Sequence, residues 1–206
     1  LADAWLHEGF ATYSESLFFE LQKGKDLYRR HMHYTKFFIK NKYPIVSEMG
    51  RRQFHYRINS DVYGKGAWVL HTLRKQIDTD TLFFDLLKSF STQNKSKIVT
   101  SKDFITHVNQ KTGEDFGWFF DQYLYKNEIP ELHYYMDNSG KVFYKWVNVP
   151  ENFNKLKVRL MVGIREIELT PSTKVQTYQT QNEYRVSFSE DVLIAQNKSK
   201  RIADHP

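Results

Sequence analysis

The hydrophobic pattern of this sequence changes its period at one place, Ile129-Pro130. Before it, apolar residues recur every three or four positions, which is the spacing of amphipathic helices. After it, apolar and polar residues alternate in short runs, as they do in half-buried β-strands. The sequence therefore predicts an α+β, multidomain chain, with an all-helical part at 1–128, a small antiparallel β-sandwich at 129–196 and a loosely held tail at 197–206.

Composition narrows the classes of protein that this chain can belong to. Its 206 residues include no cysteine, so disulfides and thiolate metal sites are excluded and any metal must be held by His, Asp or Glu. The formal charge is +6, but the lysines are spread among acidic residues, so we expect no nucleic-acid partner. No apolar run approaches the roughly 20 residues that span a bilayer, and we expect no transmembrane segment.

The sequence opens without Met and directly into a predicted helix, as expected of a piece of a longer protein. The absence of a signal peptide therefore says nothing about export of the parent protein. The sequence also leaves the oligomeric state open.

Periodicity and capping residues set the expected elements. Gly24 can end the first helix, Tyr43-Pro44 ends the second, and Thr100 with Asp103 forms a capping box for the fifth. The helices are expected at 2–22, 26–41, 61–77, 78–93, 100–113 and 116–126. Strands are expected at 132–136, 142–146, 156–160, 164–169, 175–178, 184–188 and 192–195, with a turn at Asn138-Ser139-Gly140 between the first two.

The first predicted helix has two different faces. Its core-facing stripe is expected to consist of residues spaced by three and four, namely Leu6, Phe10, Tyr13, Leu17 and Leu21. Glu8 lies on the other side, beside Ala4, Ala11, Glu15 and Phe19. The two alanines leave room for another element to pack closely next to this carboxylate. A solvated surface glutamate remains the alternative interpretation.

The histidines do not form a catalytic zinc site. His7-Glu8 begins like the helical H-E-x-x-H motif, but Ala11 stands where the second His should be. His31 and His33 are two residues apart, so on a helix their rings point in different directions and suit a surface. No two histidines lie four apart on a predicted helix. By its own residues the chain cannot complete a site with three protein ligands.

The string from Ala2 to Tyr13, ADAWLHEGFATY, nevertheless resembles the segment that follows the H-E-x-x-H helix in M1 family zinc aminopeptidases, the gluzincin group that includes aminopeptidase N and leukotriene A4 hydrolase. That segment is commonly D-x-W-L-N-E-G-F-A-x-Y, and its Glu is the third zinc ligand. The resemblance therefore implies that Glu8 is a metal ligand. His7 stands where Asn is usual, next to the ligand.

A second match lies at the expected distance after the first. The residues Val62-Tyr63-Gly64-Lys65-Gly66-Ala67 resemble the Y-x-K-G element of the same family, whose Tyr stabilises the oxyanion of the tetrahedral intermediate. The resemblance thus implies a catalytic role for Tyr63, and the alternative is a tyrosine that anchors the loop before a helix. A weaker similarity is 119–124, FFDQYL, to the family's F-x-x-Q-W/Y-L run.

The resemblance covers residues 1 to 127 and implies the helical part of a thermolysin-like catalytic domain; 129–196 would correspond to the Ig-like domain of many members. In such enzymes zinc, held by two His and one Glu, activates a water that releases N-terminal residues from peptide substrates. The H-E-x-x-H helix and the G-x-M-E-N stretch that binds the substrate's amino group have no counterpart here. We therefore expect a C-terminal fragment with an incomplete zinc site, inactive when isolated, from an active parent.

A non-catalytic alternative stays open. A peptide- or protein-binding scaffold could keep the peptidase framework, with the aromatic residues and the basic loop 50–53 forming its groove. The sequence upstream discriminates between the two, because H-E-x-x-H about eighteen residues before Glu8 would favour the enzyme.

Overall fold

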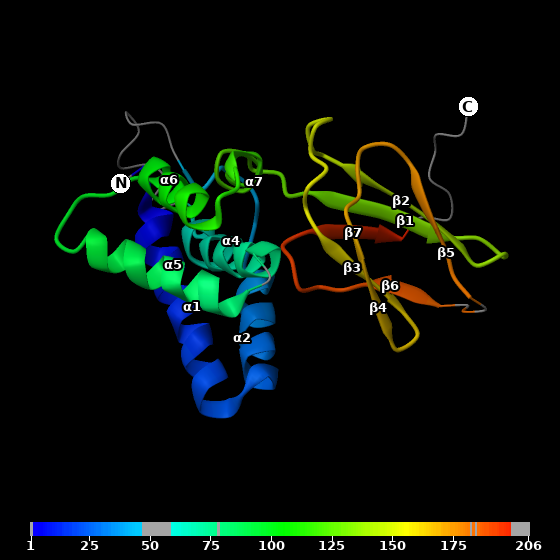
Figure 1. The fold of residues 1–206 in the computed structure, drawn as a ribbon, viewed down its shortest axis with the longest axis horizontal. Coiled ribbons are helices and arrows are strands. Elements are labelled where there is room, and N and C mark those ends of the chain that lie inside the picture. Colours follow the sequence, from blue (N-terminus) through cyan, green and yellow to red (C-terminus); the bar gives the residue numbers. More distant parts are fainter. Residues whose placement is uncertain (1, 47–58, 78, 182, 184, 199–206) are drawn as a thin grey trace. The chain divides into compact units, whose positions relative to one another are not determined.

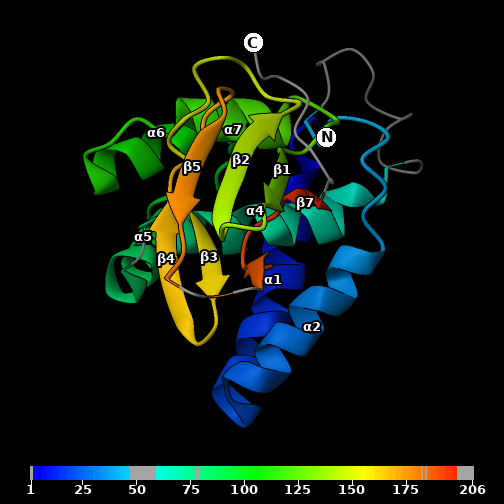
Figure 2. The ribbon, with the colours of Figure 1, turned by 90° about the vertical axis from the view of Figure 1, so that its right-hand side faces the viewer.

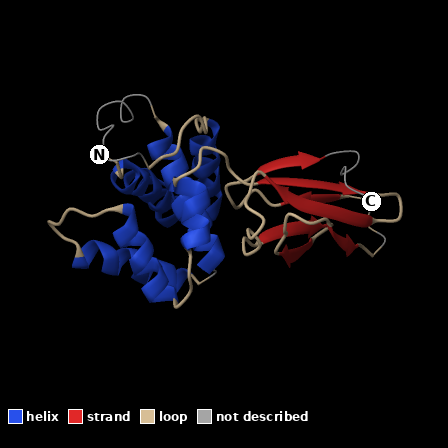
Figure 3. Ribbon diagram, turned by 90° about the horizontal axis from the view of Figure 1, so that it is seen from above, coloured by secondary structure: helices blue, strands red, loops and turns tan. Residues whose placement is uncertain are grey.

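The computed structural model describes residues 2–46, 59–77, 79–181, 183 and 185–198. These residues form two compact units, Leu1–Glu128 and Ile129–Pro206. Figure 3 shows that the helices belong to one unit and the strands to the other. The α+β class predicted from the change of period is confirmed. None of the helices in the described ranges is long and apolar enough to cross a membrane.

Helix α4 (Asp61–Ile77) is the centre of the helical unit, with α1 and α2 packed against it (Figures 1 and 2). It has the predicted bounds, and side chains all around it are buried, including Trp68, Val69 and Leu73. A helix whose side chains are buried on every side must be enclosed by others. Those around it are α1 (Ala4–Lys23), α2 (Lys25–Phe37), α5 (Asp80–Gln93), α6 (Ser101–Thr112) and α7 (Gly117–Leu124).

Capping residues explain several helix ends. At α6 the Thr100 side chain accepts from Asp103 N–H and the Asp103 carboxylate accepts from Thr100 N–H, so the predicted capping box is confirmed. Gly113 ends the same helix in the left-handed conformation. Gly24 ends α1 with φ +83° and ψ −179°, outside the left-handed helical region that we predicted but still in a region that favours glycine.

Helix α2 ends at Phe37, four residues before the predicted end at Asn41. The backbone N–H groups of Lys40 and Asn41 donate to the two carboxylate oxygens of Asp61, at 2.8 and 2.6 Å. These bonds replace the helical ones, and Asn41 takes a positive φ of 49°. The first residue of α4 therefore holds the chain that leaves α2, a long-range contact that helical periodicity does not contain.

Of the predicted core stripe of α1, Tyr13 is buried, whereas Leu6, Phe10 and Leu17 are only half-buried. The buried residues of α1 are Ala4, Trp5, Gly9, Tyr13 and Ser16, whereas Leu21 is 81% exposed. The stripe is turned because glycine, rather than a large apolar residue, makes the closest contact with α4. The predicted stripe was based on the spacing of large apolar side chains, which gives no weight to the small residue at the helix crossing.

The β unit contains two sheets, with strand orders β5-β2-β1-β7 and β4-β3-β6. Their inner faces supply the core, where the Phe188 ring lies 4.9 Å from that of Tyr134 across the two sheets. This arrangement is the predicted sandwich. Its strands are β1 (Glu131–Met136), β2 (Lys141–Val147), β3 (Val158–Val162), β4 (Arg165–Leu169), β5 (Gln176–Gln179), β6 (Val186–Phe188) and β7 (Ala195–Lys198).

Three details of the predicted sandwich and tail need correction. It is mixed rather than purely antiparallel, because β7 runs parallel to β1. The strand expected at 192–195 is also misplaced: Val192 to Ile194 are buried consecutively before the strand, and β7 begins at Ala195. Three buried residues in a row do not alternate, so they lie outside the strand. Asn197 and Lys198, expected in the tail, pair with β1, and 199–206 lie outside the described residues.

Candidate functional site

Helices α1 and α4 cross at two glycines. A Cβ atom added to Gly9 would lie 2.8 Å from the Cα of Gly66, and one added to Gly66 would lie 2.9 Å from the Cα of Gly9. Backbone therefore meets backbone at this point, which only glycine on both helices permits. Glu8 directly precedes the crossing on α1, and Tyr63 lies one turn before it on α4. The crossing thus brings the two residues that the resemblance singles out to one region of the helical unit.

Replacing Gly9 by Ala should destabilise the helical unit by about 1–3 kcal/mol, since the new methyl group would force two backbones apart. The higher helix propensity of Ala offsets about 1 kcal/mol of this loss. Urea unfolding measures the difference. Gly117→Ala is the matched control, because its Cβ would meet only the Asp115 carboxylate, which can move. Wild-type stability in Gly9→Ala would contradict the close crossing.

The Glu8 side chain is largely covered, with 15% of its surface exposed. Its Oε1 atom lies 3.4 Å from Nδ1 of His7, whose own side chain is 87% exposed. Its backbone carbonyl accepts a hydrogen bond from Thr12 Oγ1 at 2.9 Å. On the same side of the helix Ala4 is buried, but Ala11 is exposed. The burial does not support the interpretation of Glu8 as a fully solvated carboxylate.

The first turn of α4 presents Tyr63 and is held from two sides. Tyr63 itself is 39% exposed. Asp61 fastens the turn to the chain after α2, as described above. Lys65 is fully buried and its Nζ donates to the carbonyls of Lys126 and Asn127, at 3.1 and 3.2 Å. Burial lowers the pKa of Lys65 to about 8, and the Asp61 carboxylate opposes this shift.

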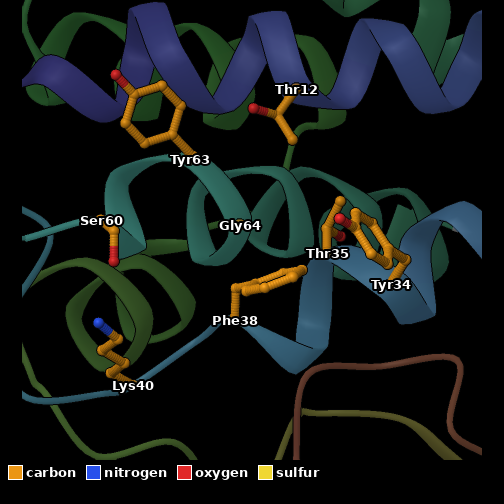
Figure 4. A pocket seen from close by; sticks show the side chains of 8 residues that line it. All are labelled: Thr12, Tyr34, Thr35, Phe38, Lys40, Ser60, Tyr63 and Gly64. Atoms are coloured by element: carbon orange, nitrogen blue, oxygen red, sulfur yellow. The ribbon is translucent and has the colours of Figure 1, made fainter.

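A pocket of about 400 Å³ opens between α1, α2 and α4 (Figure 4). Figure 4 shows the Tyr63 ring pointing from α4 toward α1, the helix that carries Thr12. Hydroxyl groups and aromatic rings share the wall with one cation, Lys40. The lining residues are Thr12, Tyr34, Thr35, Phe38, Lys40, Ser60, Tyr63 and Gly64. Sequence reasoning identified only Tyr63 among them, because the others come together only through the packing of α2.

Two other residues of the segment 2–13, Asp3 and Trp5, hold the start of α1 in place. The Asp3 carboxylate accepts from the backbone N–H of Ser101 at 2.9 Å, and Trp5 Nε1 donates to Ser101 Oγ at 2.8 Å. Together they fasten the start of α1 to α6. The start of the helix that carries Glu8 is therefore anchored a turn before the Gly9 crossing.

The described residues alone do not fit a zinc ion. Among them, no three His, Asp or Glu side chains are grouped so that they could hold a metal. His31 Nδ1 is hydrogen-bonded to Ser16 Oγ at 2.8 Å, and the His33 ring contacts Trp68. These two rings point to different partners, as expected of histidines two residues apart. The predicted basic groove loop, 50–53, lies outside the described part of the chain.

Comparison with known proteins identifies the family. Residues 2–123 match the Peptidase family M1 domain, and this chain belongs to that family. No curated protein gave a match.

Among solved structures, aminopeptidase A of Legionella pneumophila, determined in complex with aspartic acid, aligns with a TM-score of 0.72 at 17% identity. The alignment covers 97% of this chain and 24% of the Legionella chain. At this identity the likeness shows the fold. The chain thus spans about a quarter of the length of that protein.

Proposed function

We propose that this chain forms part of a zinc-dependent metallo-aminopeptidase that removes N-terminal residues from peptides. The observation that carries the proposal is the Gly9–Gly66 crossing, which places Glu8 and the pocket-lining Tyr63 each within a turn of one point. A carboxylate beside the helix crossing and a phenol in the wall of the pocket suit the cleavage of an amide. The roles proposed for Glu8 and Tyr63 are those of the M1 family motifs that their positions match.

In this proposal Glu8 is one of three zinc ligands, and two imidazoles from outside these 206 residues are the others. The Tyr63 hydroxyl donates a hydrogen bond to the oxygen of the scissile carbonyl as that oxygen becomes negative. Lys65 and Asp61 keep the first turn of α4, and with it the phenol, in place. The group that recognises the substrate's free amine also lies outside this chain.

The isolated chain should therefore bind zinc weakly and hydrolyse nothing. The test adds zinc chloride and alanine p-nitroanilide to the purified chain and follows nitroaniline release and zinc retention after dialysis. No release is expected, because one carboxylate and no imidazole pair cannot hold a catalytic zinc. Rapid release that Glu8→Ala abolishes would show a complete site within the chain and overturn this part of the proposal.

The positive test joins the missing parts to the front of this chain. In this fusion, the segment with G-x-M-E-N and H-E-x-x-H from an M1 family member precedes residue 1. We call this fusion the joined enzyme. It should retain about one zinc per chain and hydrolyse the anilide, and Glu8→Gln should release the zinc. A folded joined enzyme that retains zinc equally well with Gln at position 8 would contradict the ligand role of Glu8.

A further inference from the structure

Aromatic rings form a continuous row on the hairpin of α1 and α2. Successive ring centroids lie 4.8 to 6.4 Å apart along the order Phe18, Phe19, His31, Tyr34, Phe38 and Phe37. We call these six residues the aromatic face. Four of them are largely exposed: Phe18 at 58%, Tyr34 at 63%, Phe37 at 85% and Phe38 at 51%. Contiguous exposed apolar surface of this kind marks an interaction site far more often than scattered residues do.

The aromatic face is not needed for the core of the helical unit. Helix α2 already packs its other side inward, where Tyr28, Met32 and Thr35 are buried. This buried side also bonds to α4, because Trp68 Nε1 donates a hydrogen bond to the Met32 carbonyl at 2.8 Å. Within the aromatic face, His31 joins α2 to Ser16 and Phe19 of α1. The four largely exposed rings add apolar area outside the buried core.

The α2 side of the aromatic face is rich in positive charge. Residues 25–42 contain six Lys or Arg and one Asp, a net charge of +5. Arg30 is exposed on α2, and Lys40 lies at the end of the face, in the pocket wall. Exposed aromatic rings among cations are complementary to a ligand that is both apolar and acidic.

The aromatic face continues into the pocket that contains Tyr63. Tyr34 and Phe38 belong to both, and Figure 4 shows them on the α2 side of the pocket, across from Tyr63. From His31 to Phe38 there are seven steps along the chain, which span about 10 Å at 1.5 Å per residue of helix. That distance corresponds to about three residues of extended peptide. A peptide whose reacting bond lies near Tyr63 would therefore cover the face with the residues that follow.

We infer that the aromatic face binds the acidic, apolar stretch of a peptide substrate that extends from the Tyr63 pocket across α2. This inference rests on the proposed function, because that function is what makes the bound peptide a substrate. The rings would take the apolar side chains, and the cations of α2 would take the carboxylates. The site lies on the first helical hairpin and uses neither Glu8 nor Tyr63.

The test measures binding without turnover, so it stands apart from the test of catalysis. The probe is the octapeptide Ala-Ala-Glu-Leu-Glu-Phe-Asp-Leu with a C-terminal fluorophore, and its matched partner has Lys at the three acidic positions. Fluorescence anisotropy with the zinc-free 206-residue chain should show at least about tenfold tighter binding of the acidic peptide at low salt, and a decline as salt is raised.

Phe37→Ser and Arg30→Glu should each weaken binding of the acidic peptide by about tenfold, as the loss of an exposed aromatic or charged contact in a binding surface does. Both side chains are exposed, so folding should be unaffected, and circular dichroism checks this. Ile98→Ser is the control, because Ile98 is 99% exposed in the helical unit and lies outside the aromatic face. In the joined enzyme Phe37→Ser should raise the KM for the acidic octapeptide, and Ile98→Ser should not.

Several results would overturn the inference. These are equal binding of the two peptides, or equal binding by Phe37→Ser and wild type. Binding to vesicles of phosphatidylcholine and phosphatidylserine in place of the peptide, lost in Phe37→Ser, would assign the face to a membrane surface. A dimer in sedimentation that Phe37→Ser dissociates would assign it to a second copy. An inactive joined enzyme with intact peptide binding would refute the proposed function alone, and an active one without peptide binding would refute only this site.

Discussion

Replacing Tyr63 by Phe in the joined enzyme is expected to lower kcat by about 10²–10³-fold and to change KM by less than about twofold. Removal of one donor to a developing oxyanion has an effect of this size. The hydrogen bond strengthens as the carbonyl oxygen becomes negative, so its loss affects the transition state more than the bound substrate. Initial rates with alanine p-nitroanilide, measured over a range of substrate concentrations, separate kcat from KM.

The structure makes Tyr63→Phe a clean test. The ring is retained, and the first turn of α4 is held by Asp61 and Lys65 rather than by the phenol. Tyr125→Phe is the matched control, since it removes a partly exposed hydroxyl from the same unit. Equal effects on kcat and KM would indicate ground-state binding. Unchanged kinetics with a less stable α4 would support the alternative, in which Tyr63 only anchors the preceding loop.

Local sequence signals were sufficient for the elements that local contacts define. Helix α4 has the bounds 61–77 that its apolar stripe predicted, because that stripe lies entirely within the sequence of the helix. The capping box of Thr100 and Asp103 involves residues three apart, so the sequence alone contains it. Alternation likewise located β1 and β2, whose turn is closed by the Asp137 carboxylate.

Long-range contacts explain what the sequence could not predict. The orientation of α1 depends on Gly9 meeting Gly66, a contact between residues 57 positions apart that leaves no periodic signal. The early end of α2 depends on Asp61 in the same way. A glycine in each of the two family strings was the available clue, since glycine inside a helix is unfavourable unless close packing requires it.

The candidate site was predictable only in part. Glu8 and Tyr63 could be named through resemblance to a family, and their roles stay predictions. Composition and spacing argued against a complete zinc site within this chain, and that stays a prediction. The wall of the pocket, including Thr12 and Lys40, arises from three helices and has no signature in any one stretch. The chemistry was thus easier to predict than the surface that would select a substrate.

A buried histidine gives the helical unit a second measurable property. Tyr13 and Tyr28 share a hydrogen bond of 3.1 Å, and the Tyr28 hydroxyl lies 2.6 Å from Nδ1 of His71. Burial raises the pKa of both tyrosines, so they remain protonated, and Tyr28 can donate to a neutral imidazole. Burial also lowers the pKa of His71 to about 3, and the nearby cations Lys75, Arg74 and Lys36 add to this shift.

Acid should therefore destabilise the protein before most carboxylates titrate. Between about pH 6.5 and pH 3 the unfolded chain binds a proton at His71 that the folded chain does not, so the free energy of unfolding falls as the pH is lowered. Each pH unit in this window removes about 1.4 kcal/mol, and up to about 5 kcal/mol is lost in all. Urea unfolding at several values between pH 4.5 and 7, followed by tryptophan fluorescence, measures the slope.

His71→Gln identifies the group responsible. The Gln amide oxygen can still accept from Tyr28 but does not titrate, so the variant should lose about 1.4 kcal/mol less per pH unit than wild type. Ile98→Ser, which removes no titrating group, should keep the wild-type slope. If His71→Gln also keeps it, the proton that drives acid unfolding binds elsewhere, and the hydrogen-bonded row of Tyr13, Tyr28 and His71 is not the acid-sensitive part of the fold. The row joins α1, α2 and α4 about one turn after the Gly9 crossing. A reduced slope would show that it makes the packing of these three helices depend on pH.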